Sequence, residues 1–263
     1  MSQTYNTQGI VLSRKDFSEN DRLITLLTPH FGIIKAVAPG AKKYRSSLRG
    51  RLELFVVNDL MLVKGKSIDR IVQAQTIQSF AKLSGDLGKL SAAQYLAELI
   101  LCIGLSEQPQ VELYELCLEH LSRFSDIVIP TLLIPHLTQA VFHLLTIAGV
   151  SPTVDRCCLT EEIITPDYSI SENYLGFSFS NGGIFKIGSS NIGFEAKLGS
   201  IELSLLQYLR EPHLPEQQLS HSYTTWCKIE KILREYAQFH FNYSFRSSLL
   251  INSLSQREFI QTK

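Results

Sequence analysis

The first third of the chain alternates short apolar runs with polar turns, and no long helical pattern interrupts them. Within one run, Leu52, Leu54 and Val56 alternate with Glu53 and Phe55, as in a half-buried strand. Such runs, bounded by turn residues, predict about five strands in about 75 residues. The runs occupy residues 4–17, 21–29, 33–40, 51–65 and 68–80. Five strands with one long loop indicate the oligonucleotide/oligosaccharide-binding barrel, the OB-fold.

From residue 81 the apolar positions recur at helical spacing and mark three successive faces. These faces are Leu90, Ala93, Ala97, Ile100, Leu101 and Gly104; Tyr114, Cys117, Leu118 and Leu121; and Leu133, Leu137, Val141, Leu144 and Ala148. Three such helices in succession are expected to pack as a bundle. Residues 150–194 lose this pattern and contain short strand-like stretches, 164–170 among them, before helices resume at about residue 195.

The predicted fold class is therefore α+β, with a five-stranded OB-fold barrel followed by a mostly α-helical domain. We expect the barrel domain at residues 1–80 and the helical domain at 81–263. A small β-rich insertion is expected at 151–194, inside the helical domain.

The charge of the chain is divided unevenly, although the net charge is zero over 263 residues. Residues 1–80 hold 12 Lys and Arg against 6 Asp and Glu, whereas 81–263 hold 13 against 19. A basic half suggests a site for a polyanion on the barrel domain. Chance, or attraction between two domains, explains the count equally well.

The basic charge is concentrated in residues 35–51, which include six Lys and Arg and no acidic residue. Gly, Ser and Pro among them predict a flexible loop. Cations around an aromatic ring are typical of single-stranded nucleic-acid sites, and the phosphate contacts ignore base sequence. The candidate DNA-binding residues are Arg14, Lys35, Lys42, Lys43, Tyr44, Arg45, Arg49 and Arg51, with Lys64 and Lys66 of a predicted hairpin turn as further phosphate contacts. A solvated charged surface remains the alternative for the loop, and a plain charged turn for the hairpin.

The sequence shows no catalytic constellation and no phosphate-binding glycine motif, so we expect neither an enzyme nor a cofactor. Adjacent Cys157 and Cys158 lack the second spaced pair of a zinc site and predict no metal. His136 and His143 are better explained as core histidines than as ligands.

One uncharged stretch, residues 127–154, raises the question of a membrane helix. Pro130 and Pro135 interrupt it near its start, and no basic flank follows, so we interpret it as the most buried helix of a soluble core. The N-terminus lacks the pattern of a signal peptide, and the cysteines form no disulfide framework. We expect no membrane association and a cytoplasmic, nucleoid-associated protein.

Three motifs stand in order near the start of the chain: T-x-G-I-V-L at Thr7–Leu12, D/E-x-D-R-L-x-x-L-L-T at Glu19–Thr28 and K-x-x-A-x-G-A at Lys35–Lys43. Together they resemble the RecO family of bacterial recombination mediators. The similarity continues through residues 48–75 and returns in the terminal "REYAQFHFNYSFRSSLLI".

The resemblance implies an OB-fold domain followed by a helical domain, and binding of both single- and double-stranded DNA. It further implies annealing of complementary strands and help in loading the RecA recombinase together with RecR. Contact with the single-strand-binding protein is implied as well.

The chain departs from the family at a four-cysteine zinc module that many members carry. Of the four ligand positions only Cys157 is kept, because Thr160, Lys186 and Ser189 stand at the others. We therefore predict a metal-free module held together by its apolar residues. These are Phe177, Phe179, Ile184 and Phe185.

A different class of function stays open from the sequence. OB-fold barrels also bind proteins, so the basic loop is equally suited to the acidic tail of a partner, in a protein-interaction adaptor. An RNA-binding role is a weaker alternative, because no recognisable feature reads the 2′-hydroxyl.

Overall fold

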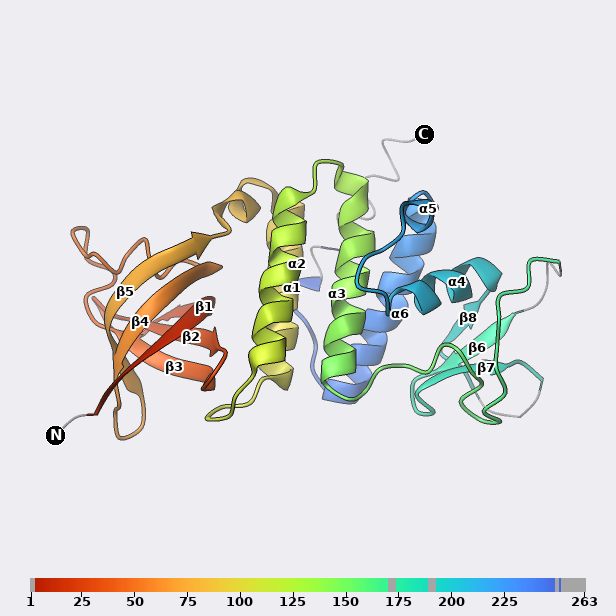
Figure 1. Cartoon of the computed structure of the whole chain (residues 1–263), viewed down its shortest axis with the longest axis horizontal. Helices are drawn as coiled ribbons and strands as arrows, with labels where there is room; N and C mark the ends of the chain where they lie inside the picture. The colour runs from red at the N-terminus through yellow and green to blue at the C-terminus, as the bar shows by residue number, and fades with distance from the viewer. Residues whose placement is uncertain (1–2, 170–173, 189–192, 249–250, 252–263) are drawn as a thin grey trace. The chain divides into compact units, whose positions relative to one another are not determined.

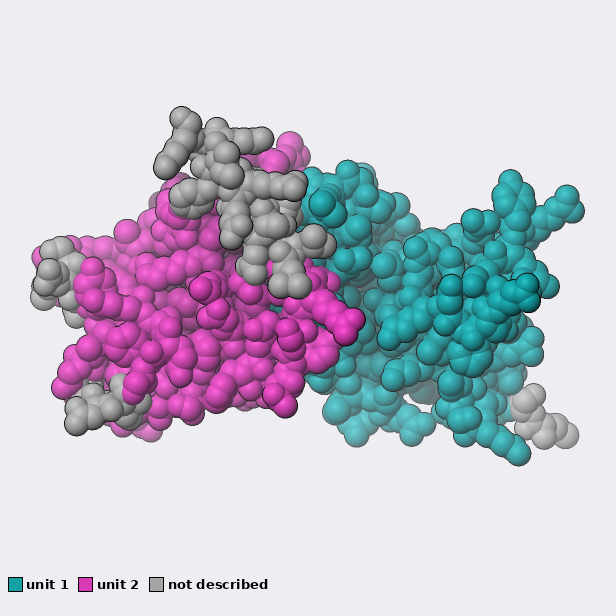
Figure 2. Space-filling model, turned by 180° about the vertical axis from the view of Figure 1, so that it is seen from behind, with its two compact units in different colours: residues 1–126 teal, residues 127–263 magenta. Residues whose placement is uncertain are grey.

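The computed structural model describes residues 3–169, 174–188, 193–248 and 251. The chain divides into two compact units, residues 1–126 and 127–263 (Figure 2). The sequence-based division into domains at residue 80 stays a prediction.

The first unit begins with five strands that close into a barrel in the order β1-β2-β3-β5-β4 (Figure 1). The strands are β1 (Thr4–Asp16), β2 (Arg22–Thr28), β3 (Gly32–Ala38), β4 (Val56–Val63) and β5 (Asp69–Ser79). All neighbours pair antiparallel except β3 and β5, which close the barrel through a short parallel contact of Ala36 with Asp69 and Val37 with Arg70. The five-stranded OB-fold barrel that the sequence predicts is confirmed.

The barrel core is built by alternate residues of the strands, since successive side chains of a strand point to opposite faces. On β3, for example, Ile34, Ala36 and Ala38 join the core whereas Lys35 is exposed. Matching apolar residues come from the other strands: Val11, Ile24, Leu26, Leu60, Leu62, Ile71 and Ala74.

The loop between β3 and β4, residues 39–55, contributes to the same core. Ala41, Leu48 and Leu52 belong to the barrel cluster, and Leu52 is fully buried. The sequence suggested a flexible loop, whereas in the structure these apolar residues anchor the loop to the barrel core. The strand expected from residue 51 is wrong at its start: residues 51–55 form turns, and Phe55 ends them at a positive φ of 61°.

A short 3-10 helix (Ala81–Gly85) and two α-helices, α1 (Leu87–Ile103) and α2 (Val111–Asp126), complete the first unit. Asp86 begins α1 by accepting the backbone N–H of Lys89 at 2.9 Å, as N-cap residues do. At the other end, a Cβ on Gly104 would lie 2.7 Å from the Ile33 side chain, so only glycine allows this close approach to β3.

The second unit contains the most apolar helix, α3 (Leu133–Ile147), which follows a 3-10 turn (Pro130–Leu132) and packs against α6 (Tyr223–Phe241). The segment Pro130–Ile147 is long and apolar enough to span a membrane by length and composition, with a mean hydropathy of 1.2. In this structure 61% of it is buried, as expected of a core helix.

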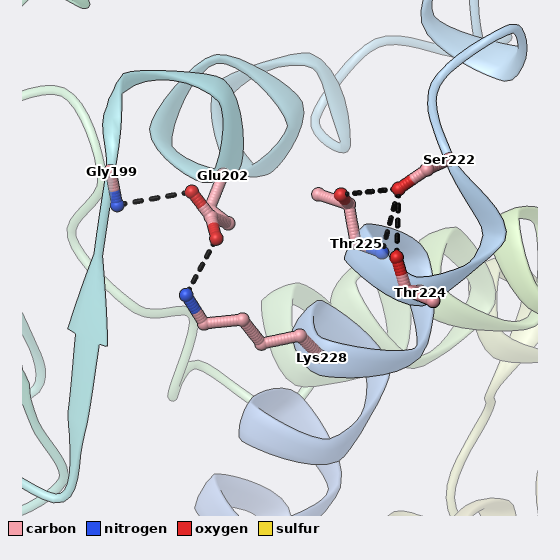
Figure 3. A network of polar contacts seen from close by, with 6 residues as sticks. All are labelled: Gly199, Glu202, Ser222, Thr224, Thr225 and Lys228. Carbon is pink, nitrogen blue, oxygen red and sulfur yellow. Dashed lines mark hydrogen bonds and ion pairs between the residues drawn. The ribbon is translucent and has the colours of Figure 1, made fainter. Parts of the chain in front are cut away.

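Two shorter helices, α4 (Ser200–Tyr208) and α5 (Glu216–Leu219), precede α6, and polar contacts join α4 to α6 (Figure 3). Glu202 accepts the backbone N–H of Gly199 at 3.0 Å and pairs with the ammonium of Lys228 at 2.5 Å. Ser222 caps α6 by accepting the N–H of Thr225 at 3.3 Å. One carboxylate thus caps α4 and holds it to α6.

The expected β-rich insertion is a three-stranded sheet of β6 (Leu175–Ser178), β7 (Gly183–Lys186) and β8 (Ala196–Leu198) in the order β7-β6-β8. The four apolar residues expected to hold it together are buried. Residues 164–169 form no strand, contrary to the prediction, and Ile170 lies outside the described residues. The sheet also extends beyond residue 194, because β8 uses residues expected to be helical.

Candidate nucleic-acid interface

The β3–β4 loop, residues 39–55, carries most of the candidate residues and is ordered by consecutive turns. The backbone N–H of Ser46 donates to the carbonyl of Lys43 at 3.1 Å, and that of Leu52 donates to the carbonyl of Leu48 at 3.1 Å. Because the apolar side chains point into the barrel, the polar ones are held on its outside.

Three loop cations, Lys43, Arg45 and Arg49, are exposed and have no ion-pair partner in the described part of the chain. Tyr44 lies among them with 88% of its surface exposed, and the Arg49 guanidinium carbon is 5.9 Å from the centre of its ring. An open aromatic ring beside unpaired cations is the combination that single-stranded nucleic acids stack on.

Other candidate DNA-binding residues form ion pairs or hydrogen bonds with residues of the first unit. Lys42 lies 3.1 Å from the carboxylate of Asp16, and Arg51 donates to the carbonyl of Ala74 at 2.6 Å. Arg14 pairs with Glu53, which also pairs with Arg22 at 3.1 Å. These contacts hold the loop in place, so phosphate would have to compete with a carboxylate for Lys42 and Arg14.

A carboxylate fixes the start of the loop. Asp21, in the turn between β1 and β2, accepts the backbone N–H of Gly40 at 2.8 Å. This hydrogen bond, with a second one from Ser18 and the nearby charges of Arg70 and Lys43, lowers the pKa of Asp21 below its ordinary value. The charged form of Asp21 therefore ties the turn to the loop at neutral pH.

Two cations lie on strands beside the loop. Lys35 of β3 and Arg70 of β5 are both exposed, and the β3–β5 register places Arg70 opposite Val37, whose side chain is on the same outer face as Lys35. Neither has an ion-pair partner among the described residues. We call Lys35, Lys43, Arg45, Arg49 and Arg70 the cationic surface.

Arg70 is absent from the sequence-based set because it lies on the predicted return strand, outside both the basic loop and the hairpin turn that holds Lys64 and Lys66. Only the parallel contact between β3 and β5 brings it next to Lys35. Its one local signal is the exposed position next to Ile71, a barrel core residue.

The hairpin between β4 and β5 carries the remaining two candidates. Lys64 lies 3.3 Å from the carboxylate of Glu107 and 4.0 Å from that of Asp69, so its charge is partly matched. Lys66 is exposed at the hairpin tip.

The residues at the positions of the zinc module do not fit a zinc ion. Burial opposes ionisation of the Cys157 thiol, but hydrogen bonds from the Thr160 hydroxyl and from the backbone N–H groups of Leu159, Thr160 and Lys186 lower its pKa overall. Lys186 ends in an ammonium 2.8 Å from the carboxylate of Glu162, and an ammonium is no ligand for zinc. Ser189 lies outside the described residues, and those described contain no cluster of three potential ligands.

The closed five-stranded barrel defines an OB-fold protein. Comparison with known proteins agrees: the family model "Recombination protein O N terminal" matches residues 1–80, and "Recombination protein O C terminal" matches residues 84–249.

Curated relatives carry the name DNA repair protein RecO. The protein of Gloeothece citriformis is 47% identical, over 98% of this chain and 100% of its own length. That of Trichodesmium erythraeum is 43% identical, over 96% and 95%. That of Nostoc sp. is 41% identical, over 96% and 97%. The chain belongs to the RecO family of DNA repair proteins.

Proposed function

We propose that this protein is a non-enzymatic recombination mediator that binds single- and double-stranded DNA through its cationic surface and anneals complementary strands. The observation that carries the proposal is the set of exposed cations around Tyr44 that have no ion-pair partner among the described residues, on a loop that the barrel core holds in place. Family membership supports the setting in DNA repair.

Annealing by such a surface needs no bond to be made or broken. Two strands repel each other through their phosphates, and bound cations reduce that repulsion while releasing counterions. Since phosphate contacts read no sequence, the bases stay available to pair. No cofactor has a role in this mechanism.

The family further supports a place in the RecA pathway, in the cytoplasm at the nucleoid. We propose that the protein works with RecR and the single-strand-binding protein to help load RecA. Phosphate contacts alone do not select these partners, so their binding is separate from the DNA test below.

The test is binding of a labelled single-stranded oligonucleotide, followed by fluorescence anisotropy across a salt series. The loop variant carries Lys42, Lys43, Arg45 and Arg49 changed to Ala. The control variant loses the same number of charges from exposed residues of the second unit. These are Arg156, Lys197, Arg210 and Lys231.

Each lost phosphate contact to a single strand should reduce the salt slope by about 0.7. We therefore expect the loop variant to lose affinity and up to about three units of slope, while the control behaves as wild type. Equal loss in both variants would show that only net charge matters. An unchanged loop variant would favour the adaptor hypothesis, and a peptide rich in Asp and Glu would then be the ligand to test.

A further inference from the structure

A groove of about 600 Å³ lies on the first unit, beside the cationic surface and apart from the β3–β4 loop. It is formed by the start of β1, the turn between β2 and β3, strand β3, the β4–β5 hairpin and the segment at residues 106–107. Its volume falls within the range of sites that hold small ligands. None of the motifs in the sequence points to it, because its lining comes from four separate stretches of the chain.

The bottom of the groove is aromatic and apolar. The rings of Tyr5 and Phe31 lie 5.1 Å apart at an interplanar angle of 55°, and Ile33 and Ile34 lie beside them. Phe31 is 38% exposed, so a large part of its ring faces the groove or the solvent. Such a ring offers a flat surface to another ring.

Hydrogen bonds fix the Tyr5 hydroxyl and the backbone of Phe31. The Tyr5 hydroxyl donates to the carboxylate of Asp69, which also accepts the backbone N–H of Gly65 at 3.0 Å. Burial, and then the contact with Asp69, raises the pKa of Tyr5, so the hydroxyl keeps the proton that it donates. On the other side, Phe31 accepts a backbone hydrogen bond from Glu107 at 3.0 Å. A site held in this way loses little conformational freedom on binding.

The rim of the groove carries cations. Lys35 lines it and has no ion-pair partner in the described part of the chain, and Lys64 lines it from the hairpin. The two carboxylates that line the groove already have partners: Asp69 accepts a hydrogen bond from the Tyr5 hydroxyl, and Glu107 lies 3.3 Å from the ammonium of Lys64. Lys35 belongs to the cationic surface as well, so the groove and that surface are continuous.

We propose that this groove holds unpaired bases of single-stranded DNA, one of them stacked on Phe31, with the adjoining phosphate at Lys35. An aromatic bottom with a cationic rim matches a flat ring that is linked to a phosphate. Bases inside a duplex are stacked on one another and cannot enter. The groove therefore gives the protein a preference for single strands, which the phosphate contacts of the loop do not provide. This inference rests on the proposed function and deepens it.

The experiment compares Phe31→Leu with Phe31→Trp. Leucine keeps an apolar side chain but removes the ring, whereas tryptophan keeps a ring for stacking. The probes are a labelled thymidine oligonucleotide, an abasic oligonucleotide of equal length and charge, and a duplex. Each is titrated by anisotropy across a salt series.

For Phe31→Leu we expect a roughly five- to hundredfold loss of affinity for the thymidine oligonucleotide, the range for removal of one stacking contact. Its salt slope, its duplex affinity and its abasic affinity should equal those of wild type, and normal duplex binding also shows that the variant is folded. Phe31→Trp should bind the thymidine oligonucleotide as wild type does.

The inference is overturned if Phe31→Leu binds the thymidine oligonucleotide as tightly as wild type. It is also overturned if the loss is equal on the abasic probe, which has no base to stack. These results differ from a failure of the proposed function. In that case wild type itself would bind none of the three probes, or would bind them without dependence on the loop cations.

Discussion

Replacing Leu52 by alanine should loosen the whole barrel, because this loop residue is part of the barrel core. Its side chain is fully buried in a cluster that draws on all five strands. Removing a buried leucine side chain costs the transfer free energy of the lost atoms and an added term for the cavity, together about 2–5 kcal/mol. A domain of ordinary stability, about 5–15 kcal/mol, survives such a loss and stays folded.

Native-state hydrogen exchange measures this loss for the barrel alone. A decrease of about 3 kcal/mol in the free energy of unfolding corresponds to about 150-fold faster exchange of the slowest amides in β1 and β4. The fluorescence of Trp226, the single tryptophan, reports on the second unit and should be unchanged. Ser47→Ala is the matched control, since Ser47 is an exposed residue of the same loop and should change the free energy by less than about 0.5 kcal/mol.

A flexible, solvated loop gives the opposite result. In that case Leu52→Ala would exchange like Ser47→Ala, and the amides of residues 39–55 would exchange at unprotected rates in wild type. An increase below about fivefold for Leu52→Ala would refute the anchoring of the loop, because it corresponds to less than about 1 kcal/mol.

Three further predictions follow from single contacts. Glu53→Gln releases the two arginines that pair with this carboxylate, so affinity for single-stranded DNA should rise severalfold at low salt in the anisotropy assay, and no gain would show that neither arginine reaches the DNA. Gly32→Ala should destabilise the barrel far more than Gly40→Ala in hydrogen exchange: both glycines have a φ of +63°, but only at Gly32 would a Cβ lie 2.0 Å from a backbone carbonyl oxygen. Glu202→Gln should destabilise the second unit by about 1 kcal/mol at pH 7 in urea unfolding followed by Trp226 fluorescence. Burial raises the pKa of Glu202, but its hydrogen bonds, led by that from Lys228, lower it overall, so the stabilisation exists above the unfolded pKa and is lost as pH falls through the folded one. A difference between Glu202→Gln and wild type that persists at low pH would contradict this origin.

The β-rich module packs against a neighbouring helix through its apolar residues. Its strands enclose Phe177, Ile184 and Phe185, all nearly inaccessible to solvent, and the side chain of Phe177 meets Tyr236 of α6 edge to face at 5.6 Å. Apolar contacts with a neighbouring helix thus stabilise a module that is too small to have a core of its own.

The fold class and most of the helices and strands could be predicted from the sequence alone, apart from the start of the strand at residue 51, the stretch 164–169 and β8. Short apolar runs bounded by turn residues predicted the strands of the barrel, and spacings of three and four predicted α1, α2 and α3; the alternation at residues 52–56, however, falls mostly on turns. These patterns can be recognised in the sequence because each element buries one face, and the period of a helix or strand sets which residues lie on that face. The cluster of cations around Tyr44 could also be recognised, because its members are close to one another in the sequence.

Only the tertiary structure decided which of these residues work together. Leu48 and Leu52 are flanked by Lys and Arg in the sequence. A loop has no regular spacing of apolar residues, so the sequence does not show whether its leucines are buried in a core or exposed to solvent. Arg70 joins the outer face that carries Lys35 through a parallel contact of two residue pairs, in which Arg70 lies opposite Val37. Tyr5 and Phe31 are far apart in sequence, but the fold brings their rings to 5.1 Å from each other. Such contacts depend on strand register and on the closure of the barrel, which the whole chain sets together, so no short stretch of sequence can encode them.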